Sequence, residues 1–330
     1  MQLFDQGKPP LGVVLDCDMG NGIGDALALA LLYGLEAKNE ARVISVSVSN
    51  SNLNAAAYVD AVMRFYSSAP KSGPFAGFSR TLPVGLADAK PLNDTPLLTD
   101  PLSKNTPDGL PVYPRNVHTL NDTAEVSALI RNALTSQYDG NCVVVLTGPA
   151  TNLAKALDLP GVKELISRKT RLLCVAGGDY PEGPPEFNFK SDVVAAKKLF
   201  AEWPAPIVAL GTETAVHLKF PGASIEKDFA WSPAHPIVDA YRAYHQMPYD
   251  AAAGNMAAAL YAVHPQDSLF KLSPPGAITV LDDGRAKFTP SSTGRHRYLI
   301  FDPVQEEKLT KSFTELASAK PAVRAPRITK

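Results

Sequence analysis

Three aspartates gather in one short segment near the start of the chain. Asp16 and Asp18 end an apolar, strand-like run, and Asp25 follows a glycine-rich turn that opens an alanine- and leucine-rich run. Asp25 alone could cap a helix and complement its dipole, but Asp16 and Asp18 cannot both have that role. Carboxylates placed this closely repel one another unless a proton or a cation lies between them, and hard divalent cations prefer oxygen ligands. The segment favours a metal or acid–base site, with a structural turn as the alternative.

Short apolar runs rich in β-branched residues alternate with helical runs along most of the chain. This pattern is typical of a parallel sheet that is covered by helices on both faces. The expected strands are 12–15, 42–48, 142–147, 170–176 and 207–210. The expected helices are 25–38, 55–66, 123–136, 152–157 and 192–201. We predict a three-layer α/β fold with a mostly parallel central sheet, in a single domain over residues 1–330.

Polar residues follow four of the expected strands, directly after Leu15, Val48, Leu146 and Ala176. Ligands of such folds bind beyond the carboxyl ends of the strands, where loops from distant parts of the sequence meet. The sequence therefore predicts one site, built from these four loops.

Two regions depart from the alternating pattern. Residues 71–116 are rich in proline and predict a long loop, either a lid or a surface excursion. The C-terminal part predicts two strands, 277–281 and 296–301, and a helix from Pro303 to about Leu316. The basic, proline-containing tail 320–330 predicts disorder.

Composition and charge exclude several classes of function. The formal net charge of −1 argues against a broad electrostatic interaction with nucleic acid or an anionic membrane, and no apolar run is long enough to span a bilayer. The first twelve residues lack the apolar stretch of a secretory signal, so we expect a cytoplasmic protein, although a trimmed secreted or periplasmic form would look the same. Cys17, Cys142 and Cys174 lie in separate apolar segments and predict buried free thiols.

The segment from Asp16 to Leu27 resembles the N-terminal signature of the inosine–uridine-preferring nucleoside hydrolases, in which a DxD pair and a glycine turn precede a DD pair and an Ala-Leu-rich helix. By this resemblance, Asp18 is a Ca²⁺ ligand and the base that activates water, and Asp25 is a second Ca²⁺ ligand. Asp16 supports these ligands from behind. The position of the family's ribose-binding aspartate is held by Gly24, which has no side chain for that role.

Three further segments agree with the resemblance. Leu146–Ala154 is similar to the family's TGPxTN segment, which implies that the Thr147 carbonyl binds calcium, while a tight turn capped by Thr151 or Asn152 is the structural alternative. The Gly-Gly pair at 177–178 and the Glu-Phe-Asn run at 186–188 resemble a ribose-binding block. Glu186 and Asn188 alternate and are expected to face one pocket, with Phe187 packed behind them. After the second strand, Asn50 or Asn52 corresponds to an asparagine near the sugar, and we assign Asn50.

Two family positions are altered near the end of the site. The run Ala258–Val263 places Asn255 where the family has its last calcium-binding aspartate, and Asp250 could replace it only after a rearrangement of the backbone. The histidine that protonates the leaving base in many relatives is replaced by Gly254. Glu213, after another strand, is a candidate for lining the pocket.

The resemblance implies a hydrolase that cleaves the N-glycosidic bond of a ribonucleoside or a related ribosyl compound with Ca²⁺ as cofactor. The expected substrate is a small ribosyl molecule, and the expected assembly is a homo-oligomer, a dimer or a tetramer. Because Gly24 and Asn255 depart from the family pattern, the alternative is a catalytically impaired member that binds a nucleoside or sugar without hydrolysis. A hydrolase for a different, modified ribosyl substrate also stays open.

Overall fold

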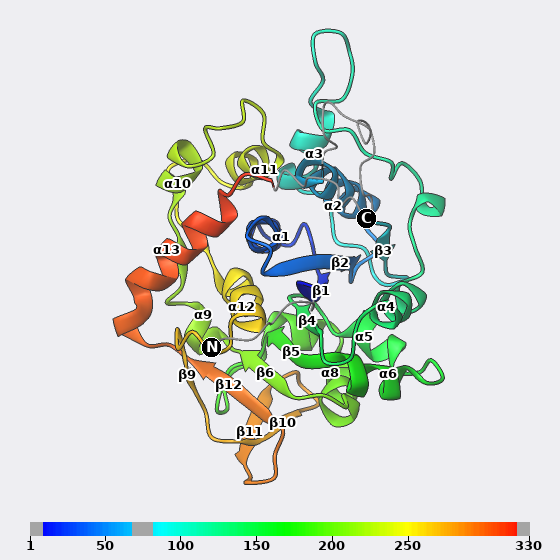
Figure 1. Ribbon diagram of the computed structural model, residues 1–330, viewed down its shortest axis with the longest axis vertical. Helices are drawn as coiled ribbons and strands as arrows, with labels where there is room; N and C mark the ends of the chain where they lie inside the picture. The colour runs from blue at the N-terminus through cyan, green and yellow to red at the C-terminus, as the bar shows by residue number, and fades with distance from the viewer. Residues whose placement is uncertain (1–8, 68–81, 322–330) are drawn as a thin grey trace, which may run out of the picture.

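The computed structural model describes residues 9–67 and 82–321, and it confirms the three-layer α/β prediction. A twisted central sheet lies between two layers of helices (Figure 1). The sheet order is β11-β10-β12-β6-β5-β4-β1-β2-β3, with β9 paired to β12 at one end. Strand β1 therefore lies inside the sheet, with β2 on one side and β4 on the other.

Seven strands of this sheet are parallel: β1 (Leu11–Cys17), β2 (Ala41–Val48), β3 (Val84–Leu86), β4 (Cys142–Leu146), β5 (Thr170–Ala176), β6 (Ile207–Leu210) and β12 (His296–Ile300). The others are antiparallel to their neighbours: β9 (Lys271–Leu272), β10 (Gly276–Val280) and β11 (Ala286–Pro290). A separate two-stranded sheet joins β7 (Lys219–Phe220) to β8 (Ala251–Ala252). Because the central strands are parallel, their carboxyl ends share one edge of the sheet.

Helices cover both faces of the sheet. One layer contains α1 (Gly24–Ala37), α2 (Leu53–Tyr66), α3 (Pro96–Ser103), α11 (Pro236–Tyr244), α12 (Gly254–Val263) and α13 (Glu306–Ala317). The other contains α4 (Val126–Thr135), α5 (Thr151–Ala156), α6 (Val162–Lys169) and α8 (Val193–Glu202). The short elements are α7 (Phe187–Ser191), α9 (Thr212–Ala215), α10 (Gly222–Lys227), η1 (Leu120–Asp122) and η2 (Pro303–Gln305).

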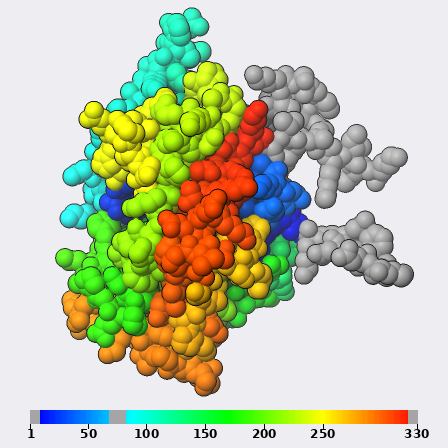
Figure 2. Space-filling model, turned by 90° about the vertical axis from the view of Figure 1, so that its left-hand side faces the viewer, coloured from blue at the N-terminus to red at the C-terminus, as the bar shows by residue number. Residues whose placement is uncertain are grey.

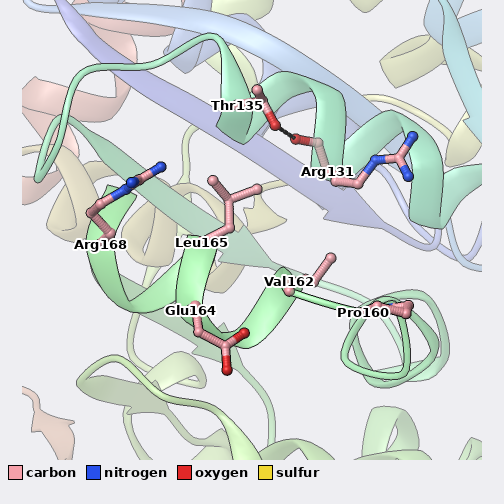
Figure 3. Close-up of a pocket in the computed structure, with 8 residues that line it drawn as sticks. Arg131, Thr135, Pro160, Val162, Glu164, Leu165 and Arg168 are labelled. Atoms are coloured by element: carbon pink, nitrogen blue, oxygen red, sulfur yellow. Dashed lines mark hydrogen bonds between the residues drawn. The ribbon is translucent and has the colours of Figure 1, made fainter.

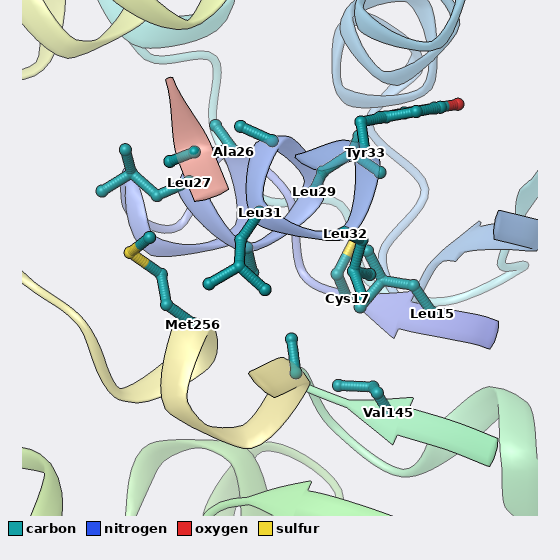
Figure 4. Close-up of a cluster of buried hydrophobic side chains, with 14 of the residues drawn as sticks. Leu15, Cys17, Ala26, Leu27, Leu29, Leu31, Leu32, Tyr33, Val145 and Met256 are labelled. Carbon is teal, nitrogen blue, oxygen red and sulfur yellow. The ribbon is translucent and has the colours of Figure 1, made fainter. Parts of the chain in front are cut away.

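The core is divided by the sheet into two apolar clusters. In β1, Val13 and Leu15 face the α1 layer and Val14 faces the α4 layer, as the two-residue period of a strand requires. Helix α1 is buried along most of its length, because α12 and α13 pack against it in addition to the sheet. Figure 4 shows its leucines beside Met256 of α12 and Leu15 of β1.

Helix α13 covers this layer from outside and lies diagonally across the face seen in Figure 2. It approaches α1 closely at Gly34, where a Cβ atom would lie 2.0 Å from the backbone oxygen of Leu316. Only a glycine at position 34 permits that contact, so Gly34 allows α13 to pack closely on α1. In the part of the chain that is described, no helix is long and apolar enough to cross a membrane.

The expected strands and helices are present, with shifted ends, and the three cysteines are buried free thiols. The described part of the proline-rich segment 71–116 also contains β3 and α3, which were not predicted. Pro96 occupies the first turn of α3, where the missing N–H costs nothing, so proline here marks the start of a helix rather than a loop. Strand β11 between the two expected C-terminal strands was not predicted. The helix after Pro303 is confirmed, whereas residues 322–330 of the tail and 71–81 of the loop lie outside the described residues.

Candidate active site

The carboxyl ends of β1, β2, β4 and β5 bring the polar loops together. Thr147 donates its backbone N–H to the backbone carbonyl of Asp16, and Ser49 donates its backbone N–H to the backbone carbonyl of Cys17. Gly148 packs directly against this junction, because a Cβ atom there would lie 2.7 Å from the Asp18 backbone nitrogen and 2.6 Å from Ser49 Oγ. The predicted single site at this edge of the sheet is therefore formed.

Asp18 and Asp25 lie in contact at the centre of the site. The two residues are only 4% and 1% exposed, and their carboxyl groups are close enough for each to shift the pKa of the other. Although Asp25 lies in the first turn of α1, the N-cap is Ile23 and no side chain caps this helix. The Asp25 carboxylate is thus available to Asp18. Burial raises the pKa of both groups, and their mutual repulsion adds to the rise for Asp18.

Asp16 lies behind this pair and is held by neighbouring elements. Its Oδ1 accepts hydrogen bonds of 2.6 Å from Ser47 Oγ and 2.8 Å from Asn152 Nδ2. Its Oδ2 is buried and has no hydrogen-bond partner among the described residues. Burial raises the pKa of Asp16 to about 7. Ser47 of β2 and Asn152 of α5 thus hold one oxygen of this carboxyl group by hydrogen bonds, and the other oxygen has no such partner among the described residues.

Two asparagine amides donate to the central pair. Asn255 Nδ2 lies 2.7 Å from Asp25 Oδ1, and Asn21 Nδ2 lies 2.9 Å from Asp18 Oδ2. The structure therefore places Asn255, as expected from the sequence, beside Asp25. Asp250 lies elsewhere and accepts a hydrogen bond from the Gly222 backbone N–H.

Thr147 and Asn188 form the adjoining part of the site. Asn188 Nδ2 donates to the Thr147 carbonyl at 3.2 Å and to the Ala176 carbonyl at 2.9 Å. The amide therefore joins the ends of β4 and β5. Asn188 is brought to the site as predicted, but its amide nitrogen is occupied by backbone oxygens.

The expected strand-like alternation of Glu186 and Asn188 is wrong. Glu186 is the N-cap of α7, and its carboxylate accepts the backbone N–H groups of Asn188 and Phe189 as well as that of Gly178. Helical geometry turns Phe187 outward, and this side chain is 48% exposed instead of packing behind the pocket. Burial raises the pKa of Glu186, while the backbone donors oppose that rise.

The two asparagines after β2 have different roles. Asn52 caps α2 by accepting the backbone N–H groups of Asn54 and Ala55. Asn50 Oδ1 accepts the backbone N–H of Asn52, whereas Asn50 Nδ2 is buried without a hydrogen-bond partner among the described residues. Of the two, Asn50 is the one whose amide nitrogen is not used by another group of the described residues.

Sequence reasoning missed two polar side chains of the site. Asn21 was read only as part of a glycine-rich turn, and Asn152 was considered as a helix cap. The cap expectation is wrong, because α5 has no side-chain cap, Asn152 turns inward to Asp16, and Thr151 donates to Asp192 at 2.8 Å.

Glu213 lies at the neighbouring end of β6, in α9. Its Oε2 accepts the Tyr180 backbone N–H at 2.9 Å, and its Oε1 is buried without a partner among the described residues. Burial raises the pKa of Glu213 to about 7. Helix α9 adjoins the start of α12, since a Cβ atom at Gly254 would lie 3.1 Å from Ala215 Cβ.

The larger surface hollow is not at this site. A cavity of about 300 Å³ lies between α4 and α6, and Figure 3 shows Arg131, Thr135, Glu164 and Arg168 around it. A second, smaller cavity of about 60 Å³ is lined in part by Asn152, which contacts Asp16. Neither of these two cavities includes Asp18, and the three aspartates are buried.

The oxygens that could bind a cation fit a divalent ion poorly. Asp18, Asp25 and the Thr147 carbonyl each accept a hydrogen bond from an asparagine amide, and two carboxylates are few for Ca²⁺. Over residues 9–67 and 82–321, no group of three or more acidic, histidine or cysteine side chains is arranged to hold a metal ion.

Carboxylates and amides gathered beyond the carboxyl ends of parallel strands define an α/β enzyme with a small-molecule site. The family model described as "Inosine-uridine preferring nucleoside hydrolase" matches residues 13–308. The chain belongs to this nucleoside hydrolase family. Membership supports a hydrolase of ribonucleosides, with a small ribosyl molecule as its substrate.

Solved structures agree on the fold. The inosine–uridine preferring nucleoside hydrolase of Bacillus anthracis is 16% identical, with a TM-score of 0.65 over 93% of this chain and 99% of that one. The purine-preferring ribonucleoside hydrolase of Gardnerella vaginalis is 17% identical, with a TM-score of 0.66 over 93% and 98%. The type III effector protein XopQ, solved in complex with adenosine diphosphate ribose, is 14% identical, with a TM-score of 0.66 over 95% of both chains. A comparison with curated protein sequences gave no match.

Proposed function

We propose that this chain hydrolyses the N-glycosidic bond of a ribonucleoside or a related ribosyl compound at the carboxylate cluster. The observation that carries the proposal is Asp18, a buried carboxylate at the end of β1 in contact with Asp25. Family membership supports the reaction class, and the loops that meet around Asp18 supply groups for binding a sugar.

In the proposed reaction, Asp18 accepts a proton from water while the water oxygen forms a bond to the anomeric carbon of the ribose. The carbon–nitrogen bond breaks through an oxocarbenium-like transition state, and its electron pair passes to the departing base. Asn50 Nδ2, a buried donor with no partner in the described part of the chain, is assigned to a ribose hydroxyl. Glu186 and Asn188 orient the remaining hydroxyls.

The departing base must be protonated, and we assign this step to Glu213. Gly254 occupies the position of the histidine that the resemblance implies, and α9 packs beside it. Glu213 has one buried oxygen without a partner among the described residues, and burial raises its pKa to about 7, so a protonated fraction is present near neutral pH.

Calcium is the cofactor that the resemblance implies, and a bound ion would polarise the attacking water. Asp18, Asp25, the Thr147 carbonyl and Asn255 would hold it. Because one oxygen of Asp18, one oxygen of Asp25 and the Thr147 carbonyl already accept amide hydrogen bonds, no step of the proposal depends on the ion.

A second candidate function is binding of a nucleoside or sugar without hydrolysis. Two observations favour it: Gly24 offers no side chain to a ribose, and neither of the two cavities described above includes Asp18. A binding protein would need to open around the cluster but would not need to activate water.

The test is a panel of purine and pyrimidine ribonucleosides together with ADP-ribose, assayed for free base and reducing sugar in the same samples. Equal amounts of base and sugar support the hydrolase. Saturable binding by calorimetry without base release would reject it in favour of the binding protein. The expected dimer or tetramer stays a prediction, which light scattering of the same sample checks.

A further inference from the structure

Three asparagine amides donate to oxygens of the aspartate cluster. Asn21 donates to Asp18 at 2.9 Å, Asn255 donates to Asp25 at 2.7 Å, and Asn188 donates to the Thr147 carbonyl at 3.2 Å. Three of the four groups named above as holding a cation therefore receive an N–H group from within the chain, and the fourth, Asn255, is itself a donor.

The orientation of these amides follows from their surroundings. Asn188 Nδ2 lies near two carbonyl oxygens, so reversing the amide would place its own oxygen against two acceptors. Reversing Asn255 or Asn21 would place an amide oxygen 2.7 Å or 2.9 Å from a carboxylate oxygen. Only a cation or a proton between the two oxygens would make that arrangement favourable.

Gly24 and Asn255 lie against one another. A Cβ atom at Gly24 would lie 3.1 Å from Asn255 Nδ2 and 3.4 Å from its Cγ. A side chain at position 24 would therefore require the amide of Asn255 to shift by a few tenths of an ångström. The two positions that depart from the family signature are in contact and together place an N–H donor on Asp25.

We propose that amide hydrogen bonds from Asn21, Asn188 and Asn255 replace a divalent cation in this chain and hold its carboxylate cluster together without Ca²⁺. A cation stabilises neighbouring carboxylates by contributing positive charge, and a charge-assisted N–H hydrogen bond contributes the same sign of charge at the same oxygen. An asparagine at position 255 provides that N–H, whereas an aspartate there would provide a metal ligand.

The test measures Ca²⁺ binding and thermal stability and needs no turnover, so its outcome is independent of the proposed hydrolysis. Metal-stripped wild-type protein is titrated with CaCl2 in a calorimeter, and its melting temperature is compared in EDTA and in millimolar CaCl2. We expect no saturable binding and a melting temperature that is the same in both conditions. Saturable binding in the micromolar range, or a rise of several degrees with calcium, would overturn the proposal.

Asn255→Asp tests the residue that carries the inference. This variant adds a carboxylate beside Asp25, so it should melt several degrees lower than wild type in EDTA and recover most of the loss in millimolar CaCl2. Asn132→Asp on the exposed surface of α4 adds the same charge away from the site and should show neither effect. An Asn255→Asp protein that is as stable as wild type in EDTA and unresponsive to calcium would contradict the role of Asn255.

Discussion

Asn255 Nδ2 lies 2.7 Å from Asp25 Oδ1, which joins residues 230 positions apart at the first turns of α12 and α1. Both helices begin at the carboxyl edge of the sheet, and neither has a side-chain cap at its N-terminus. Their first turns are therefore free to face each other. This contact closes the carboxylate cluster on the side away from β1 and fixes the direction in which Asp25 faces Asp18.

Gly148→Ala tests the packing of Asp18 against the β4–α5 turn. The added Cβ atom would lie 2.6 Å from Ser49 Oγ and 2.7 Å from the Asp18 backbone nitrogen, so Asp18 must move. We expect activity to fall by about 10²-fold, because a displacement of this size misplaces the reacting group, and stability to fall by about 1–3 kcal/mol. Steady-state kinetics and urea unfolding measure the two effects.

Gly22→Ala is the matched control, because its Cβ atom would lie 3.5 Å from the nearest atom, Tyr244 Oη. Equal activity in the two variants would show that Asp18 is not held by this contact.

Asn152→Ala tests the support of Asp16. Asn152 Nδ2 donates to Asp16 Oδ1 and, at 3.2 Å, to the Val48 carbonyl, and both acceptors are buried. Removing the donor should lower the free energy of unfolding by about 1–3 kcal/mol, since two buried hydrogen bonds are lost, although each acceptor keeps a second donor, Ser47 Oγ or the Ala87 backbone N–H. Urea unfolding of this variant is compared with that of Asn132→Ala, whose side chain is on the surface. An unchanged urea midpoint in Asn152→Ala would refute the role of Asn152 as a support.

Glu213→Gln tests the proposed protonation of the departing base. Burial raises the pKa of Glu213 to about 7, and a general acid must be protonated, so wild-type kcat should fall as the pH rises above about 7. The glutamine variant cannot donate this proton. Its kcat should be about 10²-fold lower and should not decline further between pH 7 and 9. A variant that keeps the alkaline decline of wild type would exclude Glu213 as the acid.

His235→Asn tests a buried histidine away from the site. His235 is 2% exposed and packs among aromatic rings that include Phe65 and Trp231. Its ring accepts the Ile237 backbone N–H, and burial lowers its pKa to about 3. Between pH 6.5 and 3 the unfolded chain binds a proton at this residue that the folded chain does not, so stability is lost as the pH falls. From pH 7 to pH 5 the wild type should lose roughly 2 kcal/mol more than the variant, as urea unfolding at both values measures. His118→Asn, on the surface, should behave as wild type. If His235→Asn loses as much stability as wild type, His235 does not carry this pH dependence.

Most of the central strands could be predicted because buried parallel strands are continuous apolar runs, whereas the short strands β3, β9 and β11 were not predicted. The polar ends of the predicted strands indicated the edge of the sheet at which the loops of Asp18 and Thr147 meet, and Asn188 was assigned from the family resemblance. The described part of the proline-rich segment could not be predicted, because Pro96 is as compatible with the first turn of a helix as with a loop. Residues 186–188 were expected to alternate as in a strand, but they form the start of helix α7. Three residues do not distinguish a strand from a helix start, and the backbone N–H groups that Glu186 accepts decided the outcome.

The inward contacts of Asn21 and Asn152 depend on the tertiary structure. Asn21 lies in a turn composition that is common on protein surfaces, and Asn152 shares its position with ordinary helix caps. Their partners, Asp18 and Asp16, are fixed only once β1 lies between β2 and β4. A single sequence indicates that such a residue is polar but does not indicate which buried oxygen it serves.

Base release by wild type and by Asp18→Asn, on the best substrate of the ribosyl panel, tests the central claim most directly. Asparagine has nearly the same shape as aspartate and cannot accept the proton of the attacking water. The account predicts that the free energy of unfolding of the variant, measured in urea, differs from that of wild type by less than about 1 kcal/mol. It also predicts that the kcat of the variant is at least about 10²-fold lower. A folded Asp18→Asn protein that releases base at the wild-type rate would contradict the account.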